Sequence, residues 1–230
     1  MTRSRAVIAL TKRRDCAYYD SNSHQGNRQV YCMNLSRYFK ENTIKLEMET
    51  VVEPFNKDKS REKWIVDVKT QVLEELVTLL EQDARIGNRT KLMLDFVNRE
   101  KKATTAIGNG IAIPHIRSLQ AKEFMIAFAR STEGYEFDSL DSKPSHMFFV
   151  MAAPPYEDQL YLRVFKALAE ALQYESFREE LMIIQSPGEL IRAFRSLSRS
   201  PNRQPFARSE HQFSVITSKK NEHSSWIFVL

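Results

Sequence analysis

One histidine in the segment TTAIGNGIAIPHIR, residues 104–117, has a setting that suits nucleophilic chemistry. Pro114 precedes His115 and restricts the backbone of Ile113 to an extended conformation, so the imidazole is expected at the end of a strand-like segment with little freedom to move. An imidazole can attack phosphorus with one nitrogen while the other donates a hydrogen bond that fixes the tautomer. The residue types therefore predict that His115 lies at a surface and can relay a phosphoryl group.

A phosphoryl group also needs partners for its charged oxygens, and Arg99 is the cationic candidate for that task. Thr105 and Asn109 are candidate neutral phosphate ligands, and Thr104 is a third donor. The backbone amides beside the glycines that bracket Asn109 are expected to face an anionic group, because no side chain stands in the way. Two alternatives remain. Arg99 could be a solvated residue whose positive charge is favourable at the C-terminus of a helix. Thr104, Thr105 and Asn109 could stabilise their loop without touching phosphate.

The remaining histidines and the two cysteines lack such a setting. His146 precedes an apolar run and is expected to be structural. No spacing suits a metal site or a redox pair among the others, namely His24, His211, His223, Cys16 and Cys32. The sequence shows no convincing signal peptide and no apolar run near the roughly 18 to 20 residues that cross a bilayer. These features predict a cytoplasmic protein without stable membrane insertion.

Length and charge favour one central domain. The 230 residues are 42% hydrophobic, enough for a domain of roughly 150 residues with extensions. By count, residues 1–31 carry about +4 and residues 199–230 about +3 of the formal net charge of +5, so the middle is not a basic nucleic-acid binder. Binding of nucleic acid or of an anionic membrane by the basic ends, through phosphate contacts, is the weakest alternative. We expect a flexible extension at 1–31, a folded domain at 32–198 and a flexible tail at 199–230.

Apolar periodicity predicts the helices that would position this site. The most regular pattern, from Trp64 to Leu80, recurs at three- and four-residue steps and indicates a long amphipathic helix. Gly87 and Asn88 provide a stop and a new N-cap, so a second helix is expected to end near Arg99. Shorter helices are expected after Asn34, from about Glu157, and from the capping box at Ser186 to about Leu197.

Two aromatic-rich runs, FMIAF at 124–128 and MFFVMAA at 147–153, are expected to be buried central strands. Val51 and Val52 are expected to form a further brief strand, and Glu74 and Glu75 to lie on the solvated face of the long helix. Because helices and strands are interleaved, the predicted fold is α/β: a three-layer arrangement with helices flanking both faces of a mixed sheet of about five strands.

The octapeptide GNGIAIPH resembles the active-site signature of type-two IIA domains of the bacterial phosphoenolpyruvate-dependent sugar phosphotransferase system, a family with mannitol, fructose and nitrogen-regulatory members. Arg99, in the triplet NRE, stands sixteen positions before His115, as the family's active-site arginine does. GYEFDSLDSKP, MFFVMAAP and ESFREEL resemble the family's central strand region and penultimate helix. The resemblance covers about residues 33–197 and is strongest to a stand-alone nitrogen-regulatory protein.

The resemblance implies a phosphotransferase component that needs no cofactor, nucleotide or metal. The phosphocarrier HPr, or its nitrogen-branch counterpart, would donate a phosphoryl group to His115. Sugar-transporting members then pass the group to a IIB domain and finally to a sugar. The alternative is a purely regulatory protein that binds transporters, kinases or transcription regulators according to its phosphorylation state.

One position departs from the family's pattern. The family often places a second active-site histidine at the start of the helix after AAP, where this chain reads YLRVFKALAEAL and has Tyr161. A tyrosine can donate a hydrogen bond but cannot become cationic. The replacement predicts slower phosphoryl transfer or a shift toward regulation.

Overall fold

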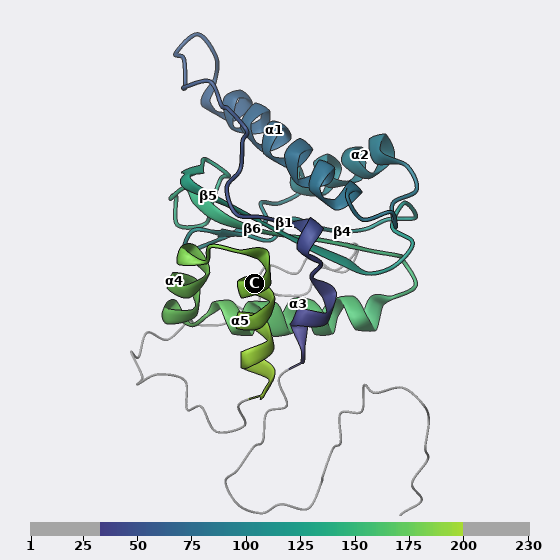
Figure 1. The fold of residues 1–230 in the computed structure, drawn as a ribbon. Coiled ribbons are helices and arrows are strands. Elements are labelled where there is room, and N and C mark those ends of the chain that lie inside the picture. The colour runs from purple at the N-terminus through teal and green to yellow at the C-terminus, as the bar shows by residue number, and fades with distance from the viewer. Residues whose placement is uncertain (1–32, 200–230) are drawn as a thin grey trace, which may run out of the picture. The chain divides into compact units, whose positions relative to one another are not determined.

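The structure is a computed structural model that describes the backbone of residues 33–199 and their side chains to residue 197. The chain divides into two units, Met1–Tyr31 and Cys32–Leu230, and the description concerns the second. The expected extension at 1–31 and almost all of the expected tail at 199–230 lie outside the described residues. The described part confirms the predicted three-layer α/β fold, with a central sheet between two layers of helices (Figure 1).

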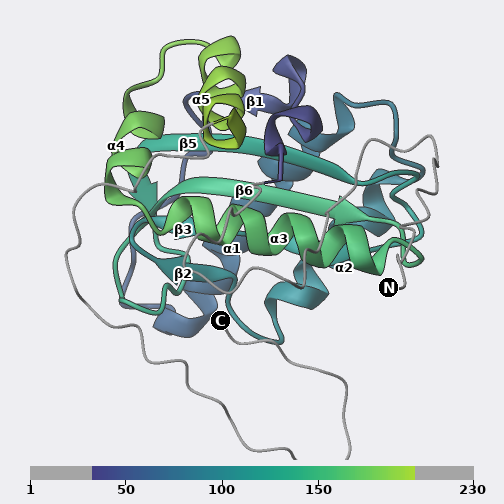
Figure 2. The same ribbon diagram turned by 90° about the horizontal axis from the view of Figure 1, so that it is seen from below.

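The two helical layers differ in content. The upper layer in Figure 1 consists of the two predicted helices, α1 (Arg61–Glu81) and α2 (Arg89–Glu100). The lower layer, seen from below in Figure 2, consists of three later helices, α3 (Asp158–Leu172), α4 (Glu175–Ile183) and α5 (Pro187–Arg199). Two short 3-10 helices precede the sheet, η1 (Leu35–Tyr38) and η2 (Glu41–Thr43). None of the helices between residues 33 and 199 is long and apolar enough to cross a membrane.

The sheet is mixed, as predicted, and residues 33–199 contribute six strands to it, close to the expected number of about five. Its strands are β1 (Ile44–Lys45), β2 (Ala106–Gly108), β3 (Ile111–Ala112), β4 (His115–Arg117), β5 (Met125–Tyr135) and β6 (Ser145–Ala153). The order is β1-β5-β6-β3-β2, and β4 also pairs with β6. The central pair β5–β6 and the hairpin β2–β3 are antiparallel, whereas β1–β5, β3–β6 and β4–β6 are parallel.

Strand β6 shows why the sheet must be covered on both faces. Phe148, Val150 and Ala152 belong to the apolar core beneath α1 and α2. The alternate residues Phe149 and Met151 pack into the opposite core, with η1, α3, α4 and α5. Both sets are completely buried. A strand with two buried faces is a continuous apolar run without polar alternation, which confirms the expectation for this segment.

Side-chain caps begin the helices where the sequence predicts them. The side chain of Asn88 accepts a hydrogen bond from Lys91 N at 2.9 Å at the start of α2. At the start of α5, Ser186 Oγ accepts from Glu189 N at 3.4 Å, and the Glu189 carboxylate accepts from Gln185 N at 2.8 Å. These bonds satisfy amides that have no partner inside the helix, so they fix the first residue of each helix.

The expected strand at Val51–Val52 is wrong. Val51 is 88% exposed, and the first strand is instead Ile44–Lys45, which pairs with β5. The predicted solvation of Glu75 is also wrong, because its carboxylate accepts hydrogen bonds from the backbone amides of Glu49 and Thr50, at 2.9 and 2.8 Å. These bonds tie the segment before Val51 to α1 instead of to the sheet. Glu74 is exposed, as expected.

A buried arginine joins the sheet to the lower layer. The two N–H groups at Nη1 of Arg130, on β5, are shared among three carbonyl oxygens at the end of α4, those of Leu181, Met182 and Ile184, at 3.1, 2.7 and 3.0 Å. Its Nε donates to the carbonyl oxygen of Leu46 at 2.9 Å. The last carbonyls of a helix lack partners within the helix, and a guanidinium supplies several donors to them at once.

Candidate active site

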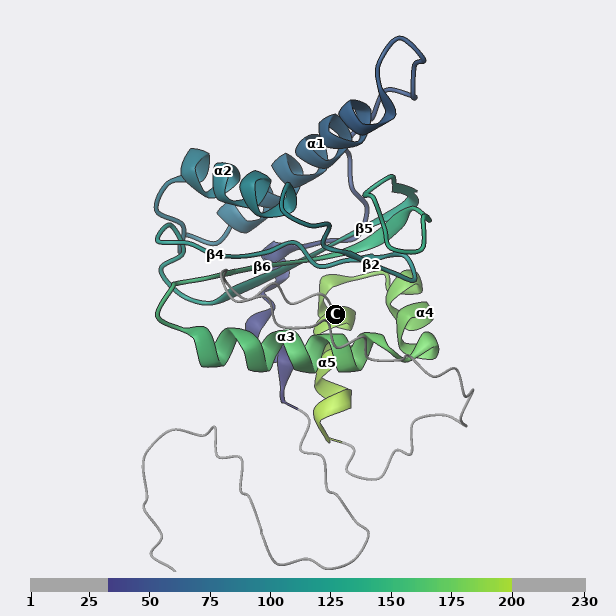
Figure 3. The ribbon, with the colours of Figure 1, turned by 180° about the vertical axis from the view of Figure 1, so that it is seen from behind.

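The backbone breaks out of the sheet between β3 and β4, immediately before His115. Both strands pair with β6 in parallel, but the amide of Ile113 donates to Thr105 O at 2.9 Å, away from β6. Pro114 has no amide hydrogen, and its carbonyl accepts from Met151 N at 2.9 Å. At this break in the strand pairing, the Ile113 carbonyl oxygen can accept a hydrogen bond from the side chain of His115. Figure 3 shows the short strand β4, which begins with His115, between α2 and α3.

The hydrogen bonds of His115 define one tautomer of its imidazole. Nδ1 lies 2.6 Å from the carbonyl oxygen of Ile113, which can only accept, so Nδ1 carries the hydrogen. Nε2 lies 3.0 Å from Nη2 of Arg99, which can only donate, so Nε2 holds the lone pair. The ring is partly exposed, as the sequence analysis expects. The result is a neutral imidazole with an oriented nucleophilic nitrogen beside a guanidinium.

Arg99 reaches this position from the last turn of α2. Its Nη1 donates to the carbonyl oxygen of Ala103 at 2.9 Å, in the turn that follows the helix. One nitrogen of the guanidinium thus anchors the side chain while the other faces His115. The structure brings together the two residues that the sequence predicts to share one phosphoryl group.

Burial sets the charge of the imidazole. The pKa of His115 is lowered to about 4, chiefly by burial; the hydrogen bond to the Ile113 carbonyl opposes this shift, and the positive charge of Arg99 contributes to it. Desolvation disfavours the imidazolium, and a nearby cation adds repulsion. His115 is therefore neutral throughout the physiological pH range.

We predict that nuclear magnetic resonance of the His115 ring nitrogens will show a single neutral tautomer from pH 8 down to about pH 5, with protonation near the pKa of about 4. Between pH 6.5, the ordinary pKa of histidine, and a pH of about 4, the unfolded chain binds a proton at His115 that the folded chain does not bind. Folding stability must then fall as the pH drops through this window. His115→Gln should lose this part of the pH dependence, and a midpoint near 6.5 in the folded protein would contradict the prediction.

Two aromatic rings on α3 line the other side of the imidazole. The ring of Phe165 meets it edge-on with centroids 5.1 Å apart, and the ring of Tyr161 lies 6.2 Å away. Burial raises the pKa of Tyr161 to about 12, so its phenol stays protonated. The structure thus places Tyr161, the residue expected in place of a second histidine, beside His115.

The threonines before β2 do not reach the imidazole. Thr105 is buried, and its hydroxyl donates to Glu100 Oε2 at 2.7 Å. The hydroxyl of Thr104 donates to the carbonyl oxygen of Phe137 at 3.1 Å. Both hydroxyls are used to hold the segment that follows α2, which is the loop-stabilising alternative from the sequence. The sequence could not show whether these threonines bind phosphate or stabilise the loop. The partner of Thr104 is the Phe137 carbonyl, far along the chain, and the partner of Thr105 is the buried carboxylate of Glu100.

Asn109 and the glycines on either side of it also lie away from His115. The three residues form the tight turn of the β2–β3 hairpin and all have positive φ angles. Ile111 pairs with Met147 and His115 with Met151, so the turn lies at least four residues further along β6, roughly 13 Å. The amide of Asn109 donates to the carboxylate of Asp141 at 2.9 Å rather than facing an open anion site.

His146 lies near that turn and has a packing role, as expected. Its Nδ1 lies 3.1 Å from the carbonyl oxygen of Ser131. The edge of its ring rests on Gly134, where a side-chain Cβ would lie 2.7 Å from the ring. No three His, Cys, Asp or Glu side chains between residues 33 and 197 gather as a metal site requires.

Neither Glu100 nor the individual exposed apolar residues near His115 could be singled out from the sequence. Glu100, next to Arg99, is buried and holds the loop after α2, although an acid at a helix end gives no signal of this in the sequence. Exposed apolar side chains also follow β4 or lie near the start of α3, namely Leu119, Tyr156 and Leu162. The ion pair between Arg117 and Asp158 joins the two segments.

Comparison with known proteins places this geometry in a family. The model of the phosphoenolpyruvate-dependent sugar phosphotransferase system EIIA 2 domain matches residues 53–196. The fructose-specific EIIA component of Haloferax volcanii is 34% identical over 118 residues, which are 51% of this chain and 77% of that protein. The fructose-specific EIIABC component of Bacillus subtilis is 33% identical over 123 residues, and the chain spans 19% of the length of that protein.

A solved structure agrees in fold. The nitrogen regulatory protein IIA-Ntr from Neisseria meningitidis superposes with a TM-score of 0.60 at 27% identity, over 70% of this chain and 99% of that chain. The family match runs from before α1 into α5 and includes both Arg99 and His115. The chain therefore belongs to the EIIA type 2 family of the phosphoenolpyruvate-dependent sugar phosphotransferase system.

Proposed function

We propose that the chain is a phosphocarrier that accepts a phosphoryl group on Nε2 of His115 from HPr or a nitrogen-branch counterpart, and passes it to a IIB domain. The observation that carries the proposal is the fixed tautomer: Nδ1–H on the Ile113 carbonyl and the Nε2 lone pair facing Arg99. Nucleophilic catalysis by histidine requires this combination of a free lone pair and a held ring.

The chemical step uses groups already in place. As the donor approaches, the Nε2 lone pair attacks phosphorus and the bond between phosphorus and the donor's leaving atom breaks. The ring gains a positive charge, which the Ile113 carbonyl stabilises through Nδ1–H. Arg99 moves off the lone pair and its Nη2 donates to the phosphoryl oxygens, while Nη1 keeps its bond to Ala103. Positioning and charge neutralisation are what phosphoryl transfer mainly requires from a protein.

The apolar residues near β4 and the start of α3 suit the docking of donor and acceptor proteins. Leu119, Tyr156 and Leu162 are 82%, 77% and 51% exposed. Exposed apolar groups beside a reactive side chain mark a contact surface. A partner that covers them would exclude water from the phosphoryl group during transfer.

The test is to incubate the full chain with phosphoenolpyruvate and the donor proteins, and to map the modified residue by mass spectrometry under non-acidic conditions. We expect one acid-labile phosphoryl group on residue 115. A IIB domain is then added, and loss of the label to it supports the carrier role. No labelling, or labelling of another residue, would overturn the proposal.

A regulatory role is the second candidate, and the likeness to a nitrogen regulatory protein along 99% of that chain favours it. In that case the phosphoryl group stays on His115 when IIB domains are added. The labelled and unlabelled forms should then differ in their binding to a transporter, kinase or transcription regulator. The same labelling experiment therefore separates the two candidates.

Tyr161 offers a neutral donor to the phosphoryl group. Its phenol stays protonated, so Tyr161→Phe should slow phosphoryl acceptance about fivefold, the value of one neutral hydrogen bond. Tyr161→His, the residue type that the family often has, should equal or exceed the wild-type rate. Rates are measured by quenched labelling, with Tyr174→Phe, at the exposed N-cap of α4, as the control. An unchanged rate in Tyr161→Phe would exclude a role for this hydroxyl.

A further inference from the structure

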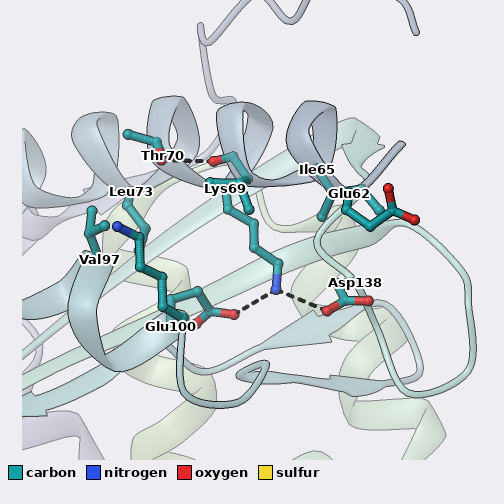
Figure 4. A pocket seen from close by; sticks show the side chains of 10 residues that line it. Glu62, Ile65, Lys69, Thr70, Leu73, Val97, Glu100 and Asp138 are labelled. Carbon is teal, nitrogen blue, oxygen red and sulfur yellow. Dashed lines mark hydrogen bonds and ion pairs between the residues drawn. The ribbon is translucent and has the colours of Figure 1, made fainter. Parts of the chain in front are cut away.

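A buried carboxylate, that of Glu100 at the end of α2, follows Arg99 directly in the chain. The side chain of Glu100 is 5% exposed and accepts three hydrogen bonds. Thr105 donates two of them, from its amide to Oε1 at 3.0 Å and from its hydroxyl to Oε2 at 2.7 Å. Lys69 on α1 donates the third, to Oε1 at 3.0 Å. Figure 4 shows Lys69 between the carboxylates of Glu100 and Asp138, in the wall of a cavity of about 250 Å³.

Hydrogen bonds connect Glu100 indirectly to both Arg99 and His115. Glu100 and Thr105 close the turn that contains the Ala103 carbonyl, and this carbonyl anchors Arg99. On the other side, Thr105 O accepts from the amide of Ile113 at 2.9 Å. The carbonyl of the same residue, Ile113, accepts from His115 Nδ1. One carboxylate therefore fixes the anchor of the guanidinium and, through two peptide groups, the acceptor that orients the imidazole.

We propose that Glu100 is a positioning residue for phosphoryl transfer, and that Lys69 and Thr105 act with it. The inference rests on the proposed function of His115 and Arg99. Glu100 touches neither the imidazole nor the phosphoryl group. It sets the geometry in which His115 Nε2 and Arg99 Nη2 both face the position of the phosphoryl group. A misplacement of about 1 Å in such a site costs roughly 100-fold in rate, so a remote carboxylate of this kind has a measurable effect.

The chain contains a matched control for this arrangement. Glu75, on α1, accepts from the amide and the hydroxyl of Thr50 and from Nζ of Lys45 at 2.7 Å. These contacts with a threonine and a lysine match those of Glu100 in kind, and Glu75 accepts one further hydrogen bond, from the amide of Glu49. Its loop, however, leads to Val51 and not to the active site. A merely structural carboxylate should behave like Glu75.

The experiment compares Glu100→Gln with Glu75→Gln in the full chain. Glutamine keeps the size of the side chain but offers one acceptor oxygen where Glu100 offers two. We expect Glu100→Gln to slow phosphorylation of His115 by about 10- to 100-fold at saturating donor, and Glu75→Gln to leave the rate near that of wild type. Thr105→Val should reproduce part of the loss, and Thr105→Ser, which keeps the hydroxyl, should recover it.

A second readout does not depend on phosphorylation. In wild type, the two ring nitrogens of His115 should give widely separated resonances because one tautomer is fixed. Glu100→Gln should bring the two resonances closer together as the second tautomer becomes populated, and Glu75→Gln should not. If wild type is labelled but Glu100→Gln and Thr105→Val keep its rate and its resonances, the positioning role is wrong. If wild type is not labelled, the proposed function fails, and the resonances still decide the role of Glu100.

Discussion

Replacing His115 with glutamine is expected to abolish phosphoryl acceptance and to leave the fold intact. Glutamine has a similar size, and its amide can still donate to the Ile113 carbonyl. It has no nitrogen lone pair available for attack on phosphorus, so labelling should fall to the level of a reaction without the chain. The imidazole is partly exposed and its Nδ1 makes one neutral hydrogen bond, so the change in unfolding free energy should stay within about 1 kcal/mol.

The matched control is His146→Gln. That histidine is also half-buried, and its Nδ1 also faces a backbone carbonyl, that of Ser131, at 3.1 Å. It lies at the far end of β6 from His115, so His146→Gln should be labelled at the wild-type rate. Labelling is followed by intact mass, and folding by thermal denaturation of each variant. Equal labelling of His115→Gln and wild type would mean that another residue carries the phosphoryl group.

The elements that carry strong local patterns were predictable from the sequence. The helix around Trp64–Leu80, the N-cap at Asn88 and the two buried strands all depend on neighbouring residues along the chain. So does the restriction that Pro114 imposes before His115. The charge of Arg99 made it a candidate partner of the phosphoryl group, but its pairing with His115 was predictable only through the resemblance, because the fifteen intervening residues give no local geometric rule.

The errors involve contacts between distant segments. The backbone near Val51 could have joined the sheet by propensity, but the carboxylate of Glu75, more than twenty residues later, takes the amides of Glu49 and Thr50. The same kind of contact conceals the role of Glu100. In both cases the sequence pattern around a glutamate on a helix is the same whether its carboxylate is solvated or accepts a hydrogen bond from a backbone amide. Tertiary contacts of single polar residues are therefore the part that periodicity cannot supply.

Removal of the guanidinium at position 99 is expected to have the second-largest effect. Arg99→Met keeps much of the side chain's length but leaves the phosphoryl oxygens without their cation, so acceptance should slow by about 100- to 1,000-fold. Arg99→Lys should recover little of this loss. Arg99 uses Nη1 on the Ala103 carbonyl and Nη2 toward His115, and one ammonium group cannot reproduce both bonds in that fixed geometry.

A second measurement on Arg99→Met separates the electrostatic role from a packing role. The positive charge of Arg99 is one cause of the lowered pKa of His115, although burial is the larger one. Loss of the charge should therefore raise the imidazole's midpoint while keeping it below 6.5. Arg89→Met, at the other end of α2 and paired with Glu74 and Glu81, is the control and should change neither the rate nor the midpoint. A slow Arg99→Met with an unmoved midpoint would show that the guanidinium shapes the site without acting on it through charge.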